Sequence, residues 1–221
     1  MGQTDPRVER LSRLDACAVS DAMDKLGLAG VVTGLPPLSV ARRIAGRVVT
    51  VKLDAGTAPP GPTRHLGTTA VAAAGPGEVI VVEQRSGIDA GSWGGILTQG
   101  ARVRGVAGVI ADGPVRDIDE AKALDFPVYA RSCTARTARG RVVERGTNVP
   151  VRIGEIEVTP GDFVIADGSA VVFIPGGEID RVLEAAQYIA DREAAMAEAI
   201  RAGQPITEVM GASYEHLLGK S

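Results

Sequence analysis

The neighbouring residues Arg116 and Asp117 are the strongest candidates for chemistry in this sequence. Arginine keeps its positive charge and binds carboxylates, while aspartate oxygens are suitable ligands for Mg²⁺. The pair follows an apolar run at residues 106–111, typical of a strand buried on both faces, and an Asp-Gly-Pro sequence at 112–114 that predicts a tight turn. Because open α/β sheets bind ligands at the carboxyl ends of their strands, we expect both side chains at one cleft. The alternative is that Asp117 only caps a helix and Arg116 is solvated.

A glycine loop formed by Gly94, Gly95, Ile96 and Leu97 precedes a predicted helix at residues 98–104. Glycines let the backbone approach a ligand closely. The first turn of a helix has unpaired N–H groups and the positive end of the helix dipole, which together suit a carboxylate or a phosphate. A glycine before a helix is also a common structural feature, so this loop is a weak signal when it is taken alone.

The other elements follow from hydrophobic periodicity and from turn residues. Asp117 and Glu120 fit a capping box, in which Asp117 would be the N-cap of a helix that ends near residue 124. Helices are predicted at residues 5–26 (with a break at 16–20), 65–74, 98–104, 117–124 and 178–202, with a last one from 205 to about 219. Strands are predicted at residues 48–53, 78–82, 106–111, 127–130, 149–158, 163–166 and 171–174, with 134–148 irregular. Because several late strands follow one another without helices, the pattern favours α/β or mixed α/β layers over a simple doubly wound sheet.

The composition excludes several classes of function. The 221 residues carry a net charge of −3 with both signs interspersed, and aromatic residues make up only 3% of the chain. This balance argues against a surface for nucleic acid or for a membrane. Cys17 and Cys133 are far apart and form no metal-binding motif. We therefore expect a cytoplasmic protein with one domain at residues 1–221, of which 177–221 form a helical C-terminal tail.

Four short motifs resemble those of the RraA-like family. They are Gly-Gly-x-Leu at 94–97, Arg-Gly-Val-Ala-Gly-Val-Ile at 104–110, Asp-Gly-x-Val-Arg-Asp at 112–117 and Phe-Pro-Val at 126–128. The family contains the class II 4-hydroxy-4-methyl-2-oxoglutarate aldolases, which also decarboxylate oxaloacetate, and the regulator of ribonuclease E activity A. The resemblance extends over about residues 15–175. It implies an α/β subunit with β/β/α layers and with N- and C-terminal helices, assembled into homotrimers or hexamers with active sites near the subunit boundaries.

The resemblance also implies roles for the residues singled out above. In the family, the aspartate that matches Asp117 holds a divalent cation, Mg²⁺ or Mn²⁺, largely through water, and the arginine that matches Arg116 contacts a small 2-keto acid substrate. The backbone N–H groups of residues 94–97 would bind the substrate carboxylate. The reaction implied is cleavage or decarboxylation of the keto acid, through a metal-stabilised enolate, to pyruvate. No nucleic acid or membrane partner is expected.

One departure from the family concerns Gly95. The active aldolases carry an acid at this position, separated from the Arg-Asp pair by twenty residues, and that acid is implicated in proton transfer. Its loss affects aldol cleavage more than decarboxylation, which needs no proton acceptor for a C4 hydroxyl. A non-catalytic regulator that binds a protein therefore remains the alternative function.

Other residues are weaker candidates. Asp112 is expected to cap the turn before Gly113, with support of the metal as the alternative, and Glu83 and Asp89 could reach the cleft. Arg139 or Arg141 could replace a basic residue that the aldolases use, and for His65 a packing or surface role is favoured over catalysis.

Overall fold

Four parallel strands form the part of the fold that carries Arg116 and Asp117. The computed structural model describes residues 5–61 and 64–211. Strands β2 (Ile44–Asp54), β3 (Val79–Gln84), β4 (Gly108–Val115) and β5 (Val128–Cys133) lie side by side in that order. β3 pairs with β2, β4 with β3 and β5 with β4, each in parallel. The carboxyl ends of these strands therefore meet at one edge of the sheet.

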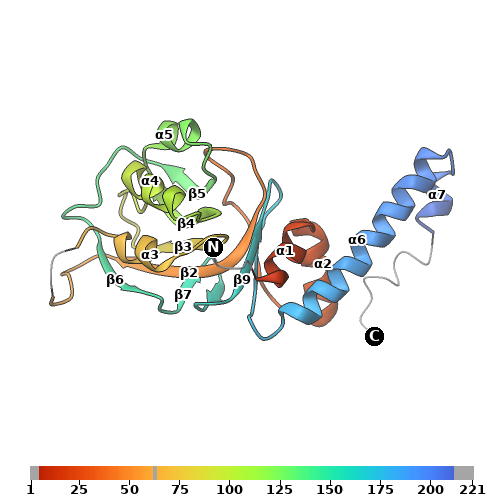
Figure 1. Cartoon of the computed structure of the whole chain (residues 1–221), viewed down its shortest axis with the longest axis horizontal. Coiled ribbons are helices and arrows are strands. Elements are labelled where there is room, and N and C mark those ends of the chain that lie inside the picture. The colour runs from red at the N-terminus through yellow and green to blue at the C-terminus, as the bar shows by residue number, and fades with distance from the viewer. Residues whose placement is uncertain (1–4, 62–63, 212–221) are drawn as a thin grey trace.

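Three short helices cover one face of the parallel strands (Figure 1). They are α3 (Thr68–Ala73), α4 (Gly95–Val103) and α5 (Ile118–Ala123), and each connects two neighbouring strands. Their apolar residues form a core with the sheet in which Trp93 and Leu97 are buried. Burial on both faces explains the continuous apolar runs of the parallel strands, since a face exposed to water would have selected polar residues.

A short hairpin packs on the opposite face, and one short strand lies beside β2. β6 (Val143–Thr147) pairs antiparallel with β2, and β7 (Val151–Ile153) forms a separate two-stranded hairpin with β8 (Ile156–Val158). Val151, Ile153 and Val158 pack with residues of the parallel strands in a second core. The parallel sheet is thus enclosed between a helical layer and a β layer, as the β/β/α expectation requires.

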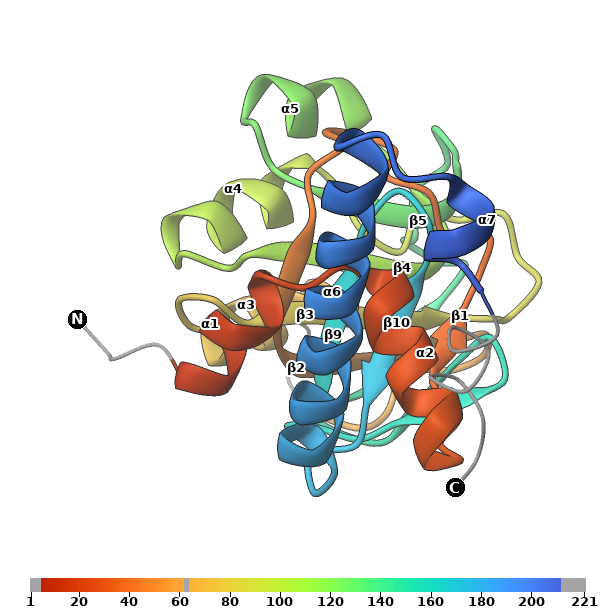
Figure 2. The same cartoon turned by 90° about the vertical axis from the view of Figure 1, so that its right-hand side faces the viewer.

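Antiparallel strands and the terminal helices form the other half of the molecule. It contains β1 (Val31–Val32), β9 (Phe163–Ala166), β10 (Val171–Ile174), α1 (Pro6–Ser12), α2 (Ala16–Leu26), α6 (Ile179–Arg201) and α7 (Ile206–Val209). Figure 2 shows α6 running beside α1 and α2, and the three helices share a core with β9 and β10. The far part of α6 projects away from the sheet (Figure 1). Within the described residues, no helix is long and apolar enough to cross a membrane.

Strand β2 belongs to both halves. Its residues 44–47 pair antiparallel with β9, and its residues 48–53 pair in parallel with β3. The path of the eight-stranded sheet is β1-β10-β9-β2-β3-β4-β5, with β6 beside β2. The structure is therefore a mixed α/β fold with one large mixed sheet and helices at both ends, as the sequence predicted.

Two sequence-based boundaries next to the candidate site were wrong. The turn expected at Asp112-Gly113-Pro114 is part of strand β4, which continues to Val115 because Pro114 and Val115 pair with β5 beyond a register shift. Helix α4 begins at Gly95 rather than at residue 98, because Gly94 already lies in the N-cap position. Both differences place Arg116 and Asp117 directly at the end of a strand and opposite the start of a helix.

Other boundaries differ away from the site. The first helical region breaks at residues 13–15, where Asp15 caps α2 by accepting a hydrogen bond from the Ala18 N–H (2.8 Å). Residues 149–158 form the hairpin β7–β8 instead of one strand, because Gly154 turns the chain with a positive φ of 56°. The segment expected to be irregular contains β6. Of the last predicted helix, α7 lies at its start, and residues 212–219 lie outside the described part.

Candidate active site

The glycine loop is joined to the end of β4 by backbone hydrogen bonds. The Ser92 N–H donates to the Pro114 carbonyl (2.8 Å), and the Arg116 N–H donates to the Trp93 carbonyl (3.0 Å). The Trp93 ring is buried, and its Nε1 donates to the Thr98 hydroxyl in the first turn of α4 (2.9 Å). These bonds fix the start of α4 against the residues that follow β4. The two stretches that the sequence singled out therefore form one unit.

Asp117 connects the two parts of this unit through its side chain. Its Oδ2 accepts a hydrogen bond from the Gly95 N–H (2.9 Å), and its Oδ1 accepts one from the Arg116 Nε (3.2 Å). The backbone of Asp117 is left-handed (φ 59°, ψ 39°), a conformation that aspartate tolerates better than most residues. Asp117 is the N-cap residue of α5, as predicted, but its side chain makes no capping bond. The predicted capping box is wrong, because the carboxylate of Asp117 accepts a hydrogen bond from the start of the neighbouring helix α4 and not from its own helix.

Gly91, which precedes the glycine loop, and Gly94, its first residue, leave space for the side chains of Arg116 and Asp117. A Cβ atom on Gly91 would lie 3.0 Å from Cγ and from Cδ of Arg116, and one on Gly94 would lie 2.9 Å from Oδ2 of Asp117. The φ of Gly94 is −158°, an extended backbone that any residue adopts, so its conformation does not require glycine. The requirement is steric. The sequence indicated a close approach of a ligand, and the structure places the side chains of Arg116 and Asp117 against these glycines.

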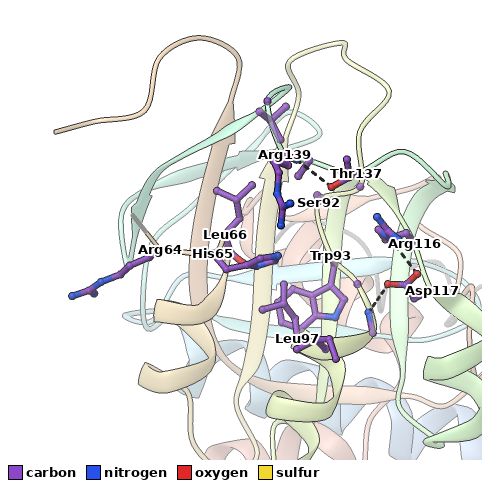
Figure 3. Close-up of a pocket in the computed structure, with 17 residues that line it drawn as sticks. Arg64, His65, Leu66, Ser92, Trp93, Leu97, Arg116, Asp117, Thr137 and Arg139 are labelled. Carbon is purple, nitrogen blue, oxygen red and sulfur yellow. Dashed lines mark hydrogen bonds and ion pairs between the residues drawn. The ribbon is translucent and has the colours of Figure 1, made fainter. Parts of the chain in front are cut away.

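A pocket of about 640 Å³ opens beside the pair. Figure 3 shows Arg116 and Asp117 at one side of it and Trp93 and Leu97 near the start of α4. It is lined by Arg64, His65, Leu66, Gly91, Ser92, Trp93, Gly94, Gly95, Ile96, Leu97, Arg116, Asp117, Thr137, Ala138, Arg139, Gly140 and Val142. This volume is in the range of pockets that bind small molecules.

The charges around the pocket favour an anionic ligand. Its lining contains three arginines, Arg64, Arg116 and Arg139, and among the described residues that line it Asp117 is the single acid. Figure 3 shows that Arg64 extends away from the Arg116–Asp117 pair. The N–H groups of Ile96 and Leu97, in the first turn of α4, have no hydrogen-bond acceptor within residues 5–61 and 64–211. An anion in this pocket would therefore meet fixed positive charge and free N–H donors.

All six residues predicted for the site line this pocket. Leu97 is 6% exposed and packs in the core between the helices and the sheet, whereas the side chain of Ile96 is 84% exposed. Arg139 also lines the pocket, but Arg141 does not and instead donates from Nη1 to the Thr137 carbonyl (3.0 Å). His65, for which a packing or surface role was favoured, lines the pocket as well.

The remaining acids considered from the sequence lie elsewhere. Glu83 accepts from the Arg152 N–H (2.8 Å), and Asp89 pairs with Arg136 (3.3 Å). Neither of the two lines the pocket. Sequence reasoning gave no role to Arg64, Gly91, Ser92 or Thr137. The proximity of these residues depends on contacts across the sheet edge for which the sequence has no local signal.

Asp112 also differs from its sequence interpretation. It neither caps a turn nor lies beside Asp117, because it is a residue of β4 and its side chain is 7% exposed. Its Oδ1 accepts from the Arg131 Nε (2.6 Å), and its Oδ2 accepts from the Gly154 N–H (2.6 Å). Arg85 lies 3.7 Å from Oδ2. Asp112 therefore joins β4 to β5 and to the β7–β8 hairpin.

The donor set suits only a cation that keeps most of its water. Among the described residues there is no group of three or more His, Cys, Asp or Glu side chains that could hold a metal ion. Asp117 is 31% exposed and has an arginine on one of its oxygens. Mg²⁺ retains several waters and is often bound through one or two carboxylates, whereas Zn²⁺ sites use three or four protein ligands. The residues present therefore fit a sparsely ligated Mg²⁺ or Mn²⁺ and do not fit zinc.

Known proteins resemble this chain over most of its length. A family model described as RraA-like, Aldolase/RraA, matches residues 16–173. A Halalkalibacterium halodurans protein, named provisionally as a 4-hydroxy-4-methyl-2-oxoglutarate aldolase, is 29% identical over 181 residues, which are 81% of each chain. A Thermus thermophilus protein named as the same aldolase is 29% identical over 137 residues, covering 60% of this chain and 76% of that one. The Legionella pneumophila protein DlpA is 25% identical, but this chain spans only 32% of its length.

Solved structures show the same fold. An uncharacterized protein from Pseudomonas syringae superposes with a TM-score of 0.83 at 26% identity, over 95% of this chain and 94% of that one. Streptomyces coelicolor RraAS2, described as an unusual member of the RNase ES inhibitor RraA protein family, gives a TM-score of 0.78 at 22% identity, over 89% and 99% of the chains. These likenesses show the fold. The match of the family model over residues 16–173 shows that the chain belongs to the RraA-like family.

Proposed function

We propose that the protein is a divalent-metal-dependent lyase that cleaves or decarboxylates 2-keto acids to pyruvate, with substrates of the 4-hydroxy-4-methyl-2-oxoglutarate and oxaloacetate type. The observation that carries this proposal is the placement of Arg116, Asp117 and the free N–H groups of α4 around one positively charged pocket. The names of relatives that cover most of the chain support the aldolase reaction.

Arg116 and the start of α4 would bind and orient the substrate. The N–H groups of Ile96 and Leu97 would receive the carboxylate next to the keto group. Arg116 would stabilise the negative charge that develops on the keto oxygen when the carbon–carbon bond breaks. The Gly95–Asp117 hydrogen bond holds these donors in place before substrate arrives, so that little rearrangement is needed.

A divalent cation held at Asp117 would supply Lewis acidity toward the keto acid. The chain itself contributes the position of the Asp117 carboxylate, which the left-handed backbone directs to α4 and which Arg116 holds from one side. Arg139, which also lines the pocket, would supply positive charge for a second carboxylate of the substrate. A small dicarboxylate with a 2-keto group matches this distribution of charge.

The test is the release of pyruvate, coupled to lactate dehydrogenase, from oxaloacetate and from 4-hydroxy-4-methyl-2-oxoglutarate. It is run with Mg²⁺ or Mn²⁺, with a chelator, and with Arg116→Ala and Asp117→Asn. A metal-only blank is subtracted because free divalent cations decarboxylate oxaloacetate. We expect activity above the blank that chelator and both substitutions abolish.

Asp119→Asn serves as the matched control, since Asp119 is two residues from Asp117, is fully exposed, and forms a surface ion pair with Lys122. Activity that survives both site substitutions would contradict the proposal. The absence of any activity from folded wild-type protein would favour a regulator that binds a protein, a function that needs no proton acceptor and is consistent with glycine at position 95.

A further inference from the structure

A carboxylate from helix α5 occupies the place that a side chain on Gly95 would take. A Cβ atom built on Gly95 would clash with Oε2 of Glu120 and would lie 2.7 Å from its Cδ. The carboxylate of Glu120 thus lies against the α-carbon of Gly95, at the first residue of α4. Gly95 and Asp117 line the pocket, whereas Glu120 is an exposed residue of α5 that lies on the other side of Gly95, outside the lining. The lack of a side chain at position 95 therefore does not leave this place without an acid.

Glu120 differs from the other acids nearby in having no fixed partner. Asp117 is bound by Arg116 and by the Gly95 N–H, and Asp119 pairs with Lys122. Within the described part of the chain, the Glu120 side chain forms no hydrogen bond and no ion pair. It also makes no capping bond to the start of its own helix, although the sequence places it three residues after the N-cap. A carboxylate without such partners is free to turn from α5 past Gly95 toward the pocket.

We propose that Glu120 is the proton acceptor for aldol cleavage in this protein, working from α5 through the space that Gly95 leaves open. This inference rests on the proposed lyase function. In the step, the Glu120 carboxylate takes the proton of the hydroxyl on the carbon to be cleaved. The carbon–carbon bond then breaks, its electron pair forms the enolate beside Arg116, and a proton from solvent converts the enolate to pyruvate. The other product carries the new carbonyl group.

Decarboxylation of oxaloacetate distinguishes this role from a structural one. Loss of carbon dioxide gives the same enolate without removing a hydroxyl proton, so it does not need Glu120. A carboxylate near the start of a helix also stabilises that helix, because its negative charge interacts favourably with the helix dipole. If Glu120 did only that, its removal would change both reactions alike, since both depend on the first turn of α4.

The experiment compares both reactions in wild-type protein, Glu120→Gln, Asp119→Asn, and the double variant Gly95→Asp/Glu120→Ala. Glutamine keeps the shape of Glu120 but accepts no proton. A proton acceptor contributes roughly 10²- to 10⁴-fold to the rate. We therefore expect Glu120→Gln to lower kcat for cleavage by about 100-fold or more, with decarboxylation changed less than about three-fold. Asp119→Asn should leave both rates unchanged.

The double variant moves the carboxylate from α5 to α4. Aspartate at position 95 no longer meets the carboxylate of residue 120, and its own carboxylate enters the vacated space. We expect cleavage to return to within about ten-fold of wild type, a recovery that a purely steric role of Glu120 would not produce. His65→Gln is included because His65 lines the pocket and could also accept a proton.

Each outcome decides the proposal. Cleavage lost selectively in Glu120→Gln and recovered in the double variant supports it. Cleavage that survives Glu120→Gln, a loss shared equally with decarboxylation, a selective loss in His65→Gln alone, or decarboxylation without any cleavage in the wild type would each overturn it while leaving the lyase site intact. The absence of both reactions in the wild type would overturn the lyase function, and with it this role.

Discussion

Asp112 lies within β4 and Asp117 lies two residues beyond its end, and the two acids differ in almost every physical respect. Asp112 is buried, and both of its oxygens are bound at 2.6 Å, one by Arg131 and one by the Gly154 N–H. Asp117 is 31% exposed, is held by one arginine at 3.2 Å, and has a left-handed backbone. One acid faces the layer of short strands and the other faces the pocket beside α4.

The difference separates an acid that stabilises the fold from one that is available for chemistry. Arg131 and the Gly154 N–H compensate the negative charge of Asp112. A carboxylate that is only 7% exposed requires such partners. Asp117 is oriented by its hydrogen bonds but remains accessible to further positive charge. Its unusual backbone conformation carries a cost of order 1–3 kcal/mol and is of the kind that concentrates at functional sites. The two acids should therefore respond in opposite ways to substitution.

Asp117→Asn should give the largest effect on activity. Asparagine tolerates the left-handed conformation and can still accept from the Gly95 N–H, so the fold should be preserved. Loss of the charge should lower kcat for pyruvate release by about 100-fold or more, as removal of one preorganised electrostatic group does elsewhere. The coupled assay and a thermal melt check both halves of this prediction. A variant that melts as wild type and retains full activity would remove Asp117 from the site.

Asp112→Ala should show the reverse pattern. It leaves Arg131 and the Gly154 N–H without their acceptor, and because the arginine is itself 36% exposed the cost is reduced to about 2–3 kcal/mol in the free energy of unfolding. Urea denaturation measures the loss, with Asp119→Ala as the exposed control. The kcat per folded molecule should change less than about three-fold, since no contact with the pocket is removed. An unchanged unfolding midpoint would refute the structural role.

Gly94→Ala tests whether the loop glycines act through the Arg-Asp pair. The added methyl group would meet the Asp117 Oδ2 at 2.9 Å and the Arg116 Cγ at 3.2 Å, and these side chains can move whereas the backbone is unstrained. We expect kcat to fall by about ten-fold because the pair is displaced, with Tm within about 2 °C of wild type. Gly168→Ala is the control, since a Cβ there meets nothing within 4 Å. Equal activity of the two variants would contradict the steric explanation.

Glu193→Gln should give the smallest effect, a change in stability. Glu193 is a third kind of acid, because it is partly buried and lies near other acidic residues. Burial, followed by repulsion from Asp15 and Asp21, raises the pKa of Glu193. The folded state therefore favours the protonated form, which contributes stability below the ordinary pKa and loses it as pH rises through the higher folded value. We expect Tm to rise by about 1–2 °C at pH 7 and not at pH 4, measured by calorimetry. A lower Tm at pH 7 would disprove the repulsion.

The sequence predicted the elements best where one pattern determines the structure. The apolar run at 106–111 indicated a buried strand, and the spacing of Ile179, Val182, Leu183 and Ala186 indicated a long helix; the structure contains both. The turn at 112–114 was wrong because pairing with β5 extends β4 through a glycine and a proline that favour turns in isolation. Local propensity was overridden there by a neighbouring strand, which the sequence does not identify.

The candidate site was predictable as residues but not as contacts. Arg116, Asp117 and the glycine loop were recognisable by type and spacing, and the structure brings them together. The bond from Gly95 to Asp117 and the place of Glu120 beside Gly95 depend on the angle between α4 and α5 and on the backbone of one aspartate. No pattern along the chain specifies these quantities. The acid missing from position 95 could thus be noticed in the sequence, but not the acid that fills its space.

Strand β2 has a consequence for how the molecule opens. One continuous stretch of backbone pairs with β9 through residues 44–47 and with β3 through residues 48–53. The terminal helices therefore cannot separate from the half that carries the pocket without breaking bonds along this strand. Amide hydrogens of β2 should exchange with solvent only through global unfolding, with the same free energy of opening on both sides of residue 47. The two halves would then unfold as a single cooperative unit. A substitution that destabilises the terminal helices would therefore also destabilise the site around Asp117.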